Sequence, residues 1–116
     1  MKFLGFWKIK KQEDLLDNMH ATLFKDALAL VKANFAGNMH FRYLDQYVNP
    51  AGYWRMDFLY KNLYVSLIAD RGCLEHEVKR NDQTIRLSEY DVNVNAIVTS
   101  SKTNLVYLIN LIKRIA

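Results

Sequence analysis

The chain has little cysteine, proline and glycine: among its 116 residues there are one cysteine, one proline and four glycines. A single cysteine cannot form a disulfide within the chain, and the three histidines lie too far apart in the sequence for zinc-ligand spacing. We therefore expect neither a disulfide nor a bound metal. The unpaired cysteine also favours a reducing compartment, which predicts a cytoplasmic protein.

Long apolar runs are absent as well. No stretch approaches the roughly 20 apolar residues of a membrane span. Residues 1–11, MKFLGFWKIKK, are interrupted by lysine too early for a secretory signal. Two interpretations of this basic, aromatic arm stay open. It packs as a first strand or arm onto the domain, or it rests on an anionic membrane surface through Phe3, Phe6, Trp7, Lys8, Lys10 and Lys11.

The net positive charge of the chain comes from this arm. The formal net charge is +4, and four lysines lie within residues 1–11. The other twelve basic residues are balanced by twelve acidic ones. Residues 12–116 therefore lack the basic surface that phosphate binding requires, and we expect no nucleic-acid partner. The whole chain is 51% hydrophobic and 24% charged, which is ordinary globular composition, and residues 12–116 are expected to form a single domain.

A long N-terminal helix is predicted over Glu13–Ala36. Its apolar residues recur at steps of three and four, as an amphipathic helix requires: Leu16, Met19, Leu23, Ala27, Leu30 and Val31. Gly37 followed by Asn38 is expected to end it.

From Met39 onward the pattern changes to a period of two, which predicts four to five antiparallel strands. The first strand is expected to place Met39, Phe41 and Tyr43 on one face. Further strands are predicted over residues 53–60, 63–70, 73–79 and 84–87, separated by short turns at residues 61–62, 71–72 and 81–83. In the first of these turns, Asn62 is expected to take the positive φ.

The C-terminal part is predicted to close the domain with a helix. Residues 88–99 alternate in polarity, which suits a strand or an extended crossing segment. Ser100 and Ser101 are candidate helix caps, followed by an apolar stripe at Leu105, Leu108, Ile109, Ile112 and Ile115. The predicted fold class is α+β: a long N-terminal helix, an antiparallel meander and a C-terminal helix.

Candidate catalytic residues are few. Cys73 and His76 are three apart on a predicted strand, so they point to opposite faces and cannot form a nucleophile–base dyad. Glu75 and Glu77 share a face at roughly 7 Å, but exposed charges on a half-buried strand are ordinary. No glycine-rich phosphate loop or known hydrolase motif occurs. We expect no enzyme and no cofactor, and keep a small hydrolase using Cys73 or the glutamates as an alternative.

Aromatic residues offer a better functional candidate. Tyr53 falls on the polar face of its predicted strand beside Arg55 and Asp57, and tyrosine and arginine are frequent in binding hot spots. Cross-strand packing on a partly solvated sheet would explain the same pattern. If Glu75 and Glu77 share this face, it would suit a basic protein partner.

The segment from Tyr53 to Asp91, about a third of the chain, resembles small bacterial proteins of the toxin-immunity type. The resemblance lies in an aromatic strand and the motifs Asp70-Arg71-Gly72, Leu74-Glu75, Ile85-Arg86-Leu87 and Tyr90-Asp91. It implies a protein-binding module that occludes a cognate toxin, but it assigns no binding residue. The provisional contacts, Tyr53, Arg55, Asp57, Glu75 and Glu77, come from the exposed face of the predicted sheet. The alternative is a peripheral membrane-associated factor anchored through residues 1–11.

Overall fold

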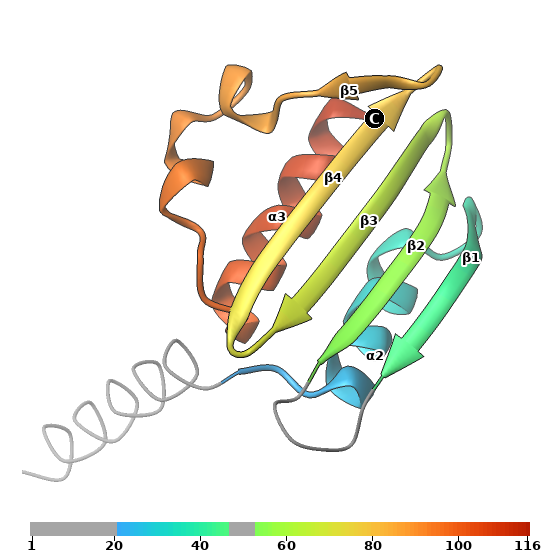
Figure 1. The fold of residues 1–116 in the computed structure, drawn as a ribbon. Coiled ribbons are helices and arrows are strands. Elements are labelled where there is room, and N and C mark those ends of the chain that lie inside the picture. The colour runs from blue at the N-terminus through green and yellow to red at the C-terminus, as the bar shows by residue number, and fades with distance from the viewer. Residues whose placement is uncertain (1–20, 47–52) are drawn as a thin grey trace, which may run out of the picture.

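A computed structural model describes residues 21–46 and 53–116 of the chain. Its elements are α2 (Phe24–Phe35), β1 (Met39–Gln46), β2 (Trp54–Tyr60), β3 (Leu63–Asp70), β4 (Cys73–Arg80), β5 (Gln83–Ile85), the 3-10 helices η1 (Leu87–Glu89) and η2 (Val92–Ala96), and α3 (Lys102–Ile115). The strands form one antiparallel sheet in the order β1-β2-β3-β4-β5 (Figure 1). The α+β class and the antiparallel meander are confirmed. The predicted arm at residues 1–11 lies outside the described residues.

The prediction of one long helix over Glu13–Ala36 is wrong. The helix α2 begins only at Phe24, and its N-cap Leu23 has extended dihedral angles. The preceding residues are extended because they bond elsewhere: the Thr22 amide donates to the Ser100 carbonyl at 2.7 Å, and Ala21 forms a bridge with Ser101. The Trp54 indole Nε1 also donates to the Thr22 carbonyl at 2.9 Å. Backbone bonds to other parts of the fold therefore replace the expected helical turn. Leu16 and Met19, in the predicted apolar stripe, lie outside the described residues.

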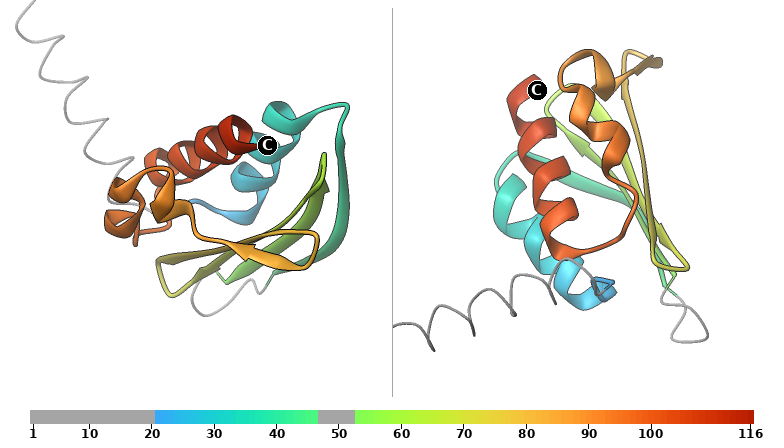
Figure 2. Two further views of the ribbon diagram at one scale, coloured as in Figure 1. Left: turned by 90° about the horizontal axis from the view of Figure 1, so that it is seen from above. Right: turned by 90° about the vertical axis from the view of Figure 1, so that its left-hand side faces the viewer.

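The two helices cover one face of the sheet, and the core lies between the helices and the sheet (Figure 2). Alternate residues of β2 and β3 point into this layer, as the period of two predicts. The buried strand residues are Trp54, Met56, Phe58, Tyr60, Leu63, Val65, Leu67 and Ala69. The helices contribute Ala27, Val31, Phe35, Leu105, Leu108, Ile109, Leu111 and Ile112. Within residues 21–46 and 53–116, no helix is long and apolar enough to cross a membrane.

Two-residue hairpin loops connect β2 to β3, β3 to β4 and β4 to β5. They close on the pairs Tyr60↔Leu63, Asp70↔Cys73 and Arg80↔Gln83. Such loops need a positive φ in their first residue or in both residues, and the residues that take it are Lys61, Arg71, Gly72, Asn81 and Asp82. In the first loop the positive φ falls on Lys61 and not, as predicted, on Asn62.

A β-bulge changes the faces of β1. The pairing runs regularly to Phe41↔Phe58 and resumes at Tyr43↔Asp57, so Arg42 is the extra residue. Side chains beyond a bulge change face relative to a regular alternation. Tyr43 therefore lies on the face opposite to Met39 and Phe41, and the prediction that these three share a face is wrong.

Residues 88–99 do not form the predicted strand, and over most of their length they are not the alternative extended crossing segment either. They fold mainly into the short helices η1 and η2, where the Asp91 side chain accepts a hydrogen bond from the Asn93 amide at 3.0 Å. Local side-chain capping of this kind competes with extended structure. Only the last residues return to the sheet, through a single bridge between Cys73 and Thr99 and a bond from the Leu74 amide to the Val98 carbonyl.

The predicted helix cap is confirmed at Ser101, whose hydroxyl oxygen accepts a bond from the Asn104 amide at 3.2 Å. The neighbouring Ser100 is 1% exposed, and its hydroxyl has no hydrogen-bond partner. The two adjacent serines therefore differ in what their hydroxyl groups contribute.

We predict that Ser101→Ala lowers the free energy of unfolding by about 1 kcal/mol, because it removes a helix cap. Ser100→Ala is the matched control and should leave stability unchanged or raised, since it removes a buried hydroxyl without a partner. Urea denaturation of both variants measures the difference. Equal losses of stability in both would contradict the assignment of the cap to Ser101.

Candidate functional site

One face of the sheet carries no helix in the described part of the chain (Figure 2). We call it the open face; it is formed by the side chains of β1 to β4 that point away from α2 and α3. Strand register assigns to it His40, Tyr43, Asp45, Arg55, Asp57, Leu59, Tyr64, Ser66, Ile68, Asp70, Cys73, Glu75, Glu77 and Lys79. Figure 1 looks directly onto this face.

The predicted contact residues are brought to this one face, but in two groups. Arg55 and Asp57 lie on β2, with Tyr53 just before it, while Glu75 and Glu77 lie on β4. The strand β3 separates them, since Ile68 stands between Arg55 and Glu75 in the register. Two strand spacings amount to about 10 Å. A partner that contacts both groups must therefore span the central strand.

Asp57 is the unusual residue of the open face because it is a carboxylate only 4% exposed. Both of its oxygens accept bonds from Arg55, Oδ1 from Nε at 3.0 Å and Oδ2 from a terminal guanidinium nitrogen at 3.1 Å. The Tyr64 hydroxyl also donates to Oδ2, at 3.2 Å. Bidentate, charge-assisted bonds of this kind are strong and fix orientation. Asp57 is therefore too buried to contact a partner directly, and it would contribute to binding by orienting Arg55 and Tyr64.

Arg55 is held from a second side. Its guanidinium lies over the Tyr43 ring, 5.7 Å from the ring centroid, and the Tyr43 hydroxyl donates to the Asp45 carboxylate at 3.2 Å. The pKa of Arg55 is raised, chiefly by the hydrogen bond to Asp57 and by the charge of that carboxylate. The Arg55 side chain nevertheless stays 38% exposed. The result is a permanently charged, oriented guanidinium that a partner can reach.

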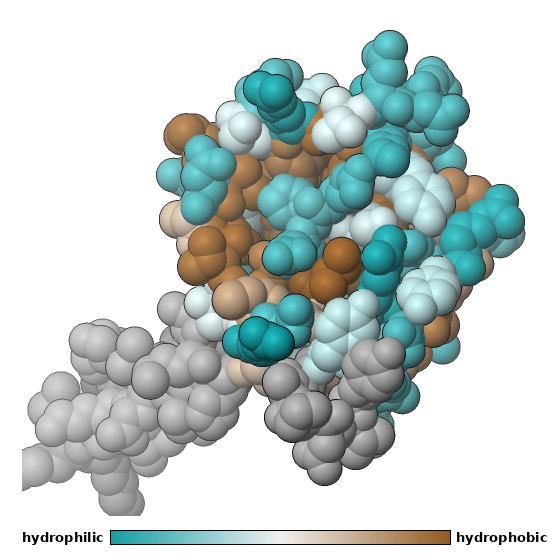
Figure 3. All heavy atoms as spheres, in the orientation of Figure 1, coloured by the Kyte–Doolittle hydropathy of each residue, from teal (hydrophilic) through white to brown (hydrophobic). Residues whose placement is uncertain are grey.

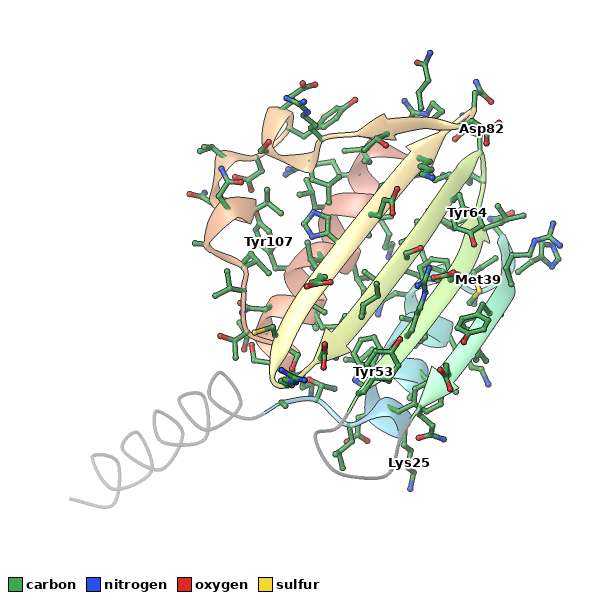
Figure 4. All side chains as sticks on the ribbon, in the orientation of Figure 1. Lys25, Met39, Tyr53, Tyr64, Asp82 and Tyr107 are labelled. Atoms are coloured by element: carbon green, nitrogen blue, oxygen red, sulfur yellow. The ribbon has the colours of Figure 1, made fainter. Side chains whose placement is uncertain are left out.

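A hollow of about 440 Å³ lies beside this cluster on the open face. Its lining comes from β2, β3 and β4 and from two of the hairpin loops: Arg55, Leu59, Asn62, Tyr64, Ser66, Glu77, Lys79, Asn81 and Asp82. Figure 4 shows Tyr64 and Asp82 toward the upper end of the sheet and Tyr53 toward the lower end. Within the hollow, Lys79 pairs with Glu77 at 3.3 Å. The hollow is therefore polar, with its charges largely paired.

The open face is polar and acidic overall. Teal and white side chains cover most of the sheet in Figure 3, while hydrophobic surface shows on the left, beyond β4. Among the strand residues of the open face, the acids are Asp45, Asp57, Asp70, Glu75 and Glu77, and the bases are Arg55 and Lys79. Asp70 forms an ion pair with Arg71 of the adjoining turn, at 4.0 Å. Because the two bases are paired with Asp57 and Glu77, the surplus negative charge belongs to Asp45 and Glu75.

A larger hollow, of about 620 Å³, lies on the helical side of the molecule. It is lined mainly by α2 and the residues before it, with Lys102 from the start of α3. Among residues 21–46 and 53–116, its walls hold one acid and one base, Asp26 and Lys102, and several alanines. The lining residues that the structure describes form no cluster of charged or aromatic groups comparable to that around Arg55, so size alone does not make this hollow the better candidate.

The residues considered for catalysis do not come together. Cys73 is exposed and lies opposite Asp70 in the β3–β4 register. His76 lies opposite the buried Leu67 and so points to the core face. Burial lowers the pKa of His76. The predicted opposition of these two side chains is confirmed. Across residues 21–46 and 53–116, no group of three or more histidines, cysteines and acids is placed to hold a metal ion.

Sequence reasoning missed two members of the cluster, Tyr43 and Tyr64. Regular alternation assigns Tyr43 to the wrong face, because the bulge at Arg42 leaves no signal in the sequence pattern. Tyr64 was placed on the correct strand, but its bond to Asp57 connects residues seven apart across a hairpin. A signal was present: an aspartate, a serine and a tyrosine on the outward positions of two paired strands indicate a polar cluster.

Removing Arg55 should destabilise the fold by about 2 kcal/mol, because Asp57 is then a buried carboxylate without its main partner. A double-mutant cycle with Arg55→Ala and Asp57→Ala should give a coupling energy of about that size. The pair Glu77 and Lys79 is the matched control, with the same spacing on the same face but both side chains exposed. Its coupling should be below about 0.5 kcal/mol. Similar coupling in the two pairs would show that Asp57 is not especially dependent on Arg55.

The hydrogen bond from Tyr64 predicts a loss of stability at alkaline pH. The pKa of Tyr64 is raised, first by partial burial and then by the charge and hydrogen bond of Asp57. The folded state therefore keeps this proton to higher pH than the unfolded state, so the free energy of unfolding falls as pH rises above the ordinary tyrosine value of 10.0. In denaturation at increasing pH, Tyr64→Phe should reduce this fall, and the exposed Tyr90→Phe should not. An identical slope in both variants would contradict the assignment.

Comparison of the chain with protein-family models, with curated proteins and with solved structures finds no match. No relative therefore supplies a binding partner or a catalytic residue by analogy. The geometry of the open face is therefore the main basis for a functional proposal.

Proposed function

We propose that this chain is a non-enzymatic protein-binding domain whose open face docks a partner protein. The observation that carries the proposal is the cluster of Tyr43, Arg55, Asp57 and Tyr64 near the middle of a sheet face that no helix of the described residues covers. Binding hot spots are enriched in tyrosine and arginine that are already held in their bound orientation. Here both residue types are fixed by a buried carboxylate.

Preorganisation distinguishes this cluster from ordinary surface polarity. A free arginine side chain loses rotamer freedom when a partner immobilises it, at about 0.5–1.5 kcal/mol. Arg55 has already lost that freedom, because two hydrogen bonds and an aromatic ring hold its guanidinium. A partner that hydrogen-bonds to the remaining N–H groups of Arg55 thus meets a smaller entropic penalty.

The charge of the face favours a basic partner. Asp45 and Glu75 are its unbalanced acids, one on β1 and the other on β4, so the surplus extends across the sheet. Opposite charge on a partner would speed association and fix its orientation. The same surplus repels phosphate groups, which argues against single-stranded nucleic acid stacking on the exposed tyrosines.

Within this proposal the chain acts by occlusion, as an immunity protein does when it covers a toxin. The resemblance of residues 53–91 to immunity-type proteins supports this version, since that segment includes β2 to β4 and most of the open face. A surface built on paired strands also suits steric blocking, because it needs no moving part.

A charge-reversal experiment tests the proposal. The full chain is used to isolate its partner from the source cell's lysate, and the dissociation constant is then measured with purified components. Glu75→Lys should weaken binding at least about tenfold, because it places like charge against a basic partner. Tyr43→Ala should weaken it as well, by releasing Arg55. Glu89→Lys, at an exposed acid of η1 away from the open face, is the matched control and should leave affinity unchanged.

Unchanged affinity in Glu75→Lys and Tyr43→Ala would remove the open face as the docking surface. Equal weakening by Glu89→Lys would show that affinity responds to the net charge of the chain and not to charge on the open face. For the immunity version, the captured partner must be toxic when expressed alone and harmless when co-expressed with this chain. Arg55→Ala is a poor probe of binding, since its predicted loss of stability would lower affinity indirectly.

A further inference from the structure

The outer edge of β1 is a second surface with unusual properties. β1 is the terminal strand of the sheet, and no other strand of the described residues pairs with its outer side. It has eight residues, whereas the strand at the opposite edge, β5, has three. An unpaired strand edge presents backbone N–H and C=O groups that can bond another strand.

We propose that two copies of this chain pair through β1, antiparallel and edge to edge, joining their sheets into one. The occupant of the edge is thus a second copy of the same strand. Because such a contact is isologous, every residue pair across it occurs twice. The sequence of β1 must therefore be complementary to itself, and this can be examined residue by residue.

The bulge determines which self-pairing is allowed. Side chains of directly opposed residues must point to the same face. On β1, His40, Tyr43 and Asp45 lie on the open face, whereas Met39, Phe41, Leu44 and Gln46 lie on the core face. In a strand without a bulge, His40 and Asp45 would point to opposite faces, because they are an odd number of residues apart. His40 could then not pair with Asp45 of another copy. The extra residue, Arg42, brings them to the same face.

One register then runs along all eight residues, matches faces in every pair outside the bulge and sets the two bulges against each other. It pairs Met39 with Gln46, His40 with Asp45, Phe41 with Leu44, and Arg42 with Tyr43 of the other copy. No like charges are opposed. The pair of Phe41 and Leu44 is apolar, and Leu44 is 43% exposed in the single chain. Cross-strand pairs of these kinds each favour association modestly.

A bulge and an exposed arginine can also serve to protect an edge from pairing. That explanation accounts for Arg42 alone. It does not account for an imidazole and a carboxylate that fall opposite each other in the one register that uses the whole strand. The two explanations predict different oligomeric states, so the choice between them is experimental.

The first test is sedimentation equilibrium of the full chain from micromolar to millimolar concentration. The proposal predicts a reversible dimer of twice the 13.6 kDa chain mass. His40→Asp places carboxylates opposite each other in both copies of the pair and should raise the dimer dissociation constant about tenfold. Thr84→Asp, at the exposed edge strand β5, is the matched control and should not change it. A monomer at every concentration, or a dimer insensitive to His40→Asp, would overturn the proposal.

Cysteine cross-linking tests the register directly. In a Cys73→Ser background, the single variants His40→Cys and Asp45→Cys are oxidised alone and mixed. Directly opposed residues have Cα atoms about 4.5–5.5 Å apart, a separation that a disulfide spans. The mixture should form a disulfide-linked heterodimer, and each variant alone should form much less. Cross-linking that is no greater in the mixture would rule out this register. Circular dichroism confirms that each variant is folded, and neither test involves the partner of the open face.

Discussion

The structure depends on a one-sided core. The helices α2 and α3 bury one face of the sheet, so every second residue of the central strands is committed to packing. Because side chains alternate strictly along a strand, this commitment also determines which residues lie on the opposite face. Burial of Phe58 and Val65, for example, places Asp57 and Tyr64 outward. The packing of the core therefore determines which sequence positions form the open face, and only the identity of the side chains at those positions can change.

Asp57 is the exception that gives the open face its organisation. A strand position that points away from the core would ordinarily hold a solvated side chain, but Asp57 is almost completely covered by its own neighbours. Burial of a carboxylate is unfavourable unless its oxygens are hydrogen-bonded, and Arg55 and Tyr64 meet that requirement. The stability of the domain and the geometry of its proposed binding surface thus share one set of contacts. A change that improves binding by altering Arg55 would be expected to lower stability.

The sequence predicted what depends on local periodicity and not what depends on a single backbone irregularity. The meander, the strand over Leu63–Asp70 and the cap at Ser101 follow from alternation and turn chemistry, and the structure agrees. Among the features that escaped prediction, three change the course of the backbone or the face of a side chain. Bonds from Thr22 to a distant part of the chain shorten the first helix, the bulge at Arg42 moves Tyr43 to the open face, and the turn capped by Asp91 replaces a strand. Each is set by contacts or geometry that a sequence pattern does not encode.

The two-residue hairpins have an implication for how such a surface could change over time. From β2 to β5 the loops are as short as antiparallel hairpins allow, and most of their residues hold a positive φ. Lengthening one would alter the register or tilt of the strands that carry the core. New specificity can therefore arise at little structural risk only by exchanging outward side chains on β1 to β4, one at a time. The scaffold would keep its shape while its chemistry diverged, so that close relatives could share a backbone and recognise different partners.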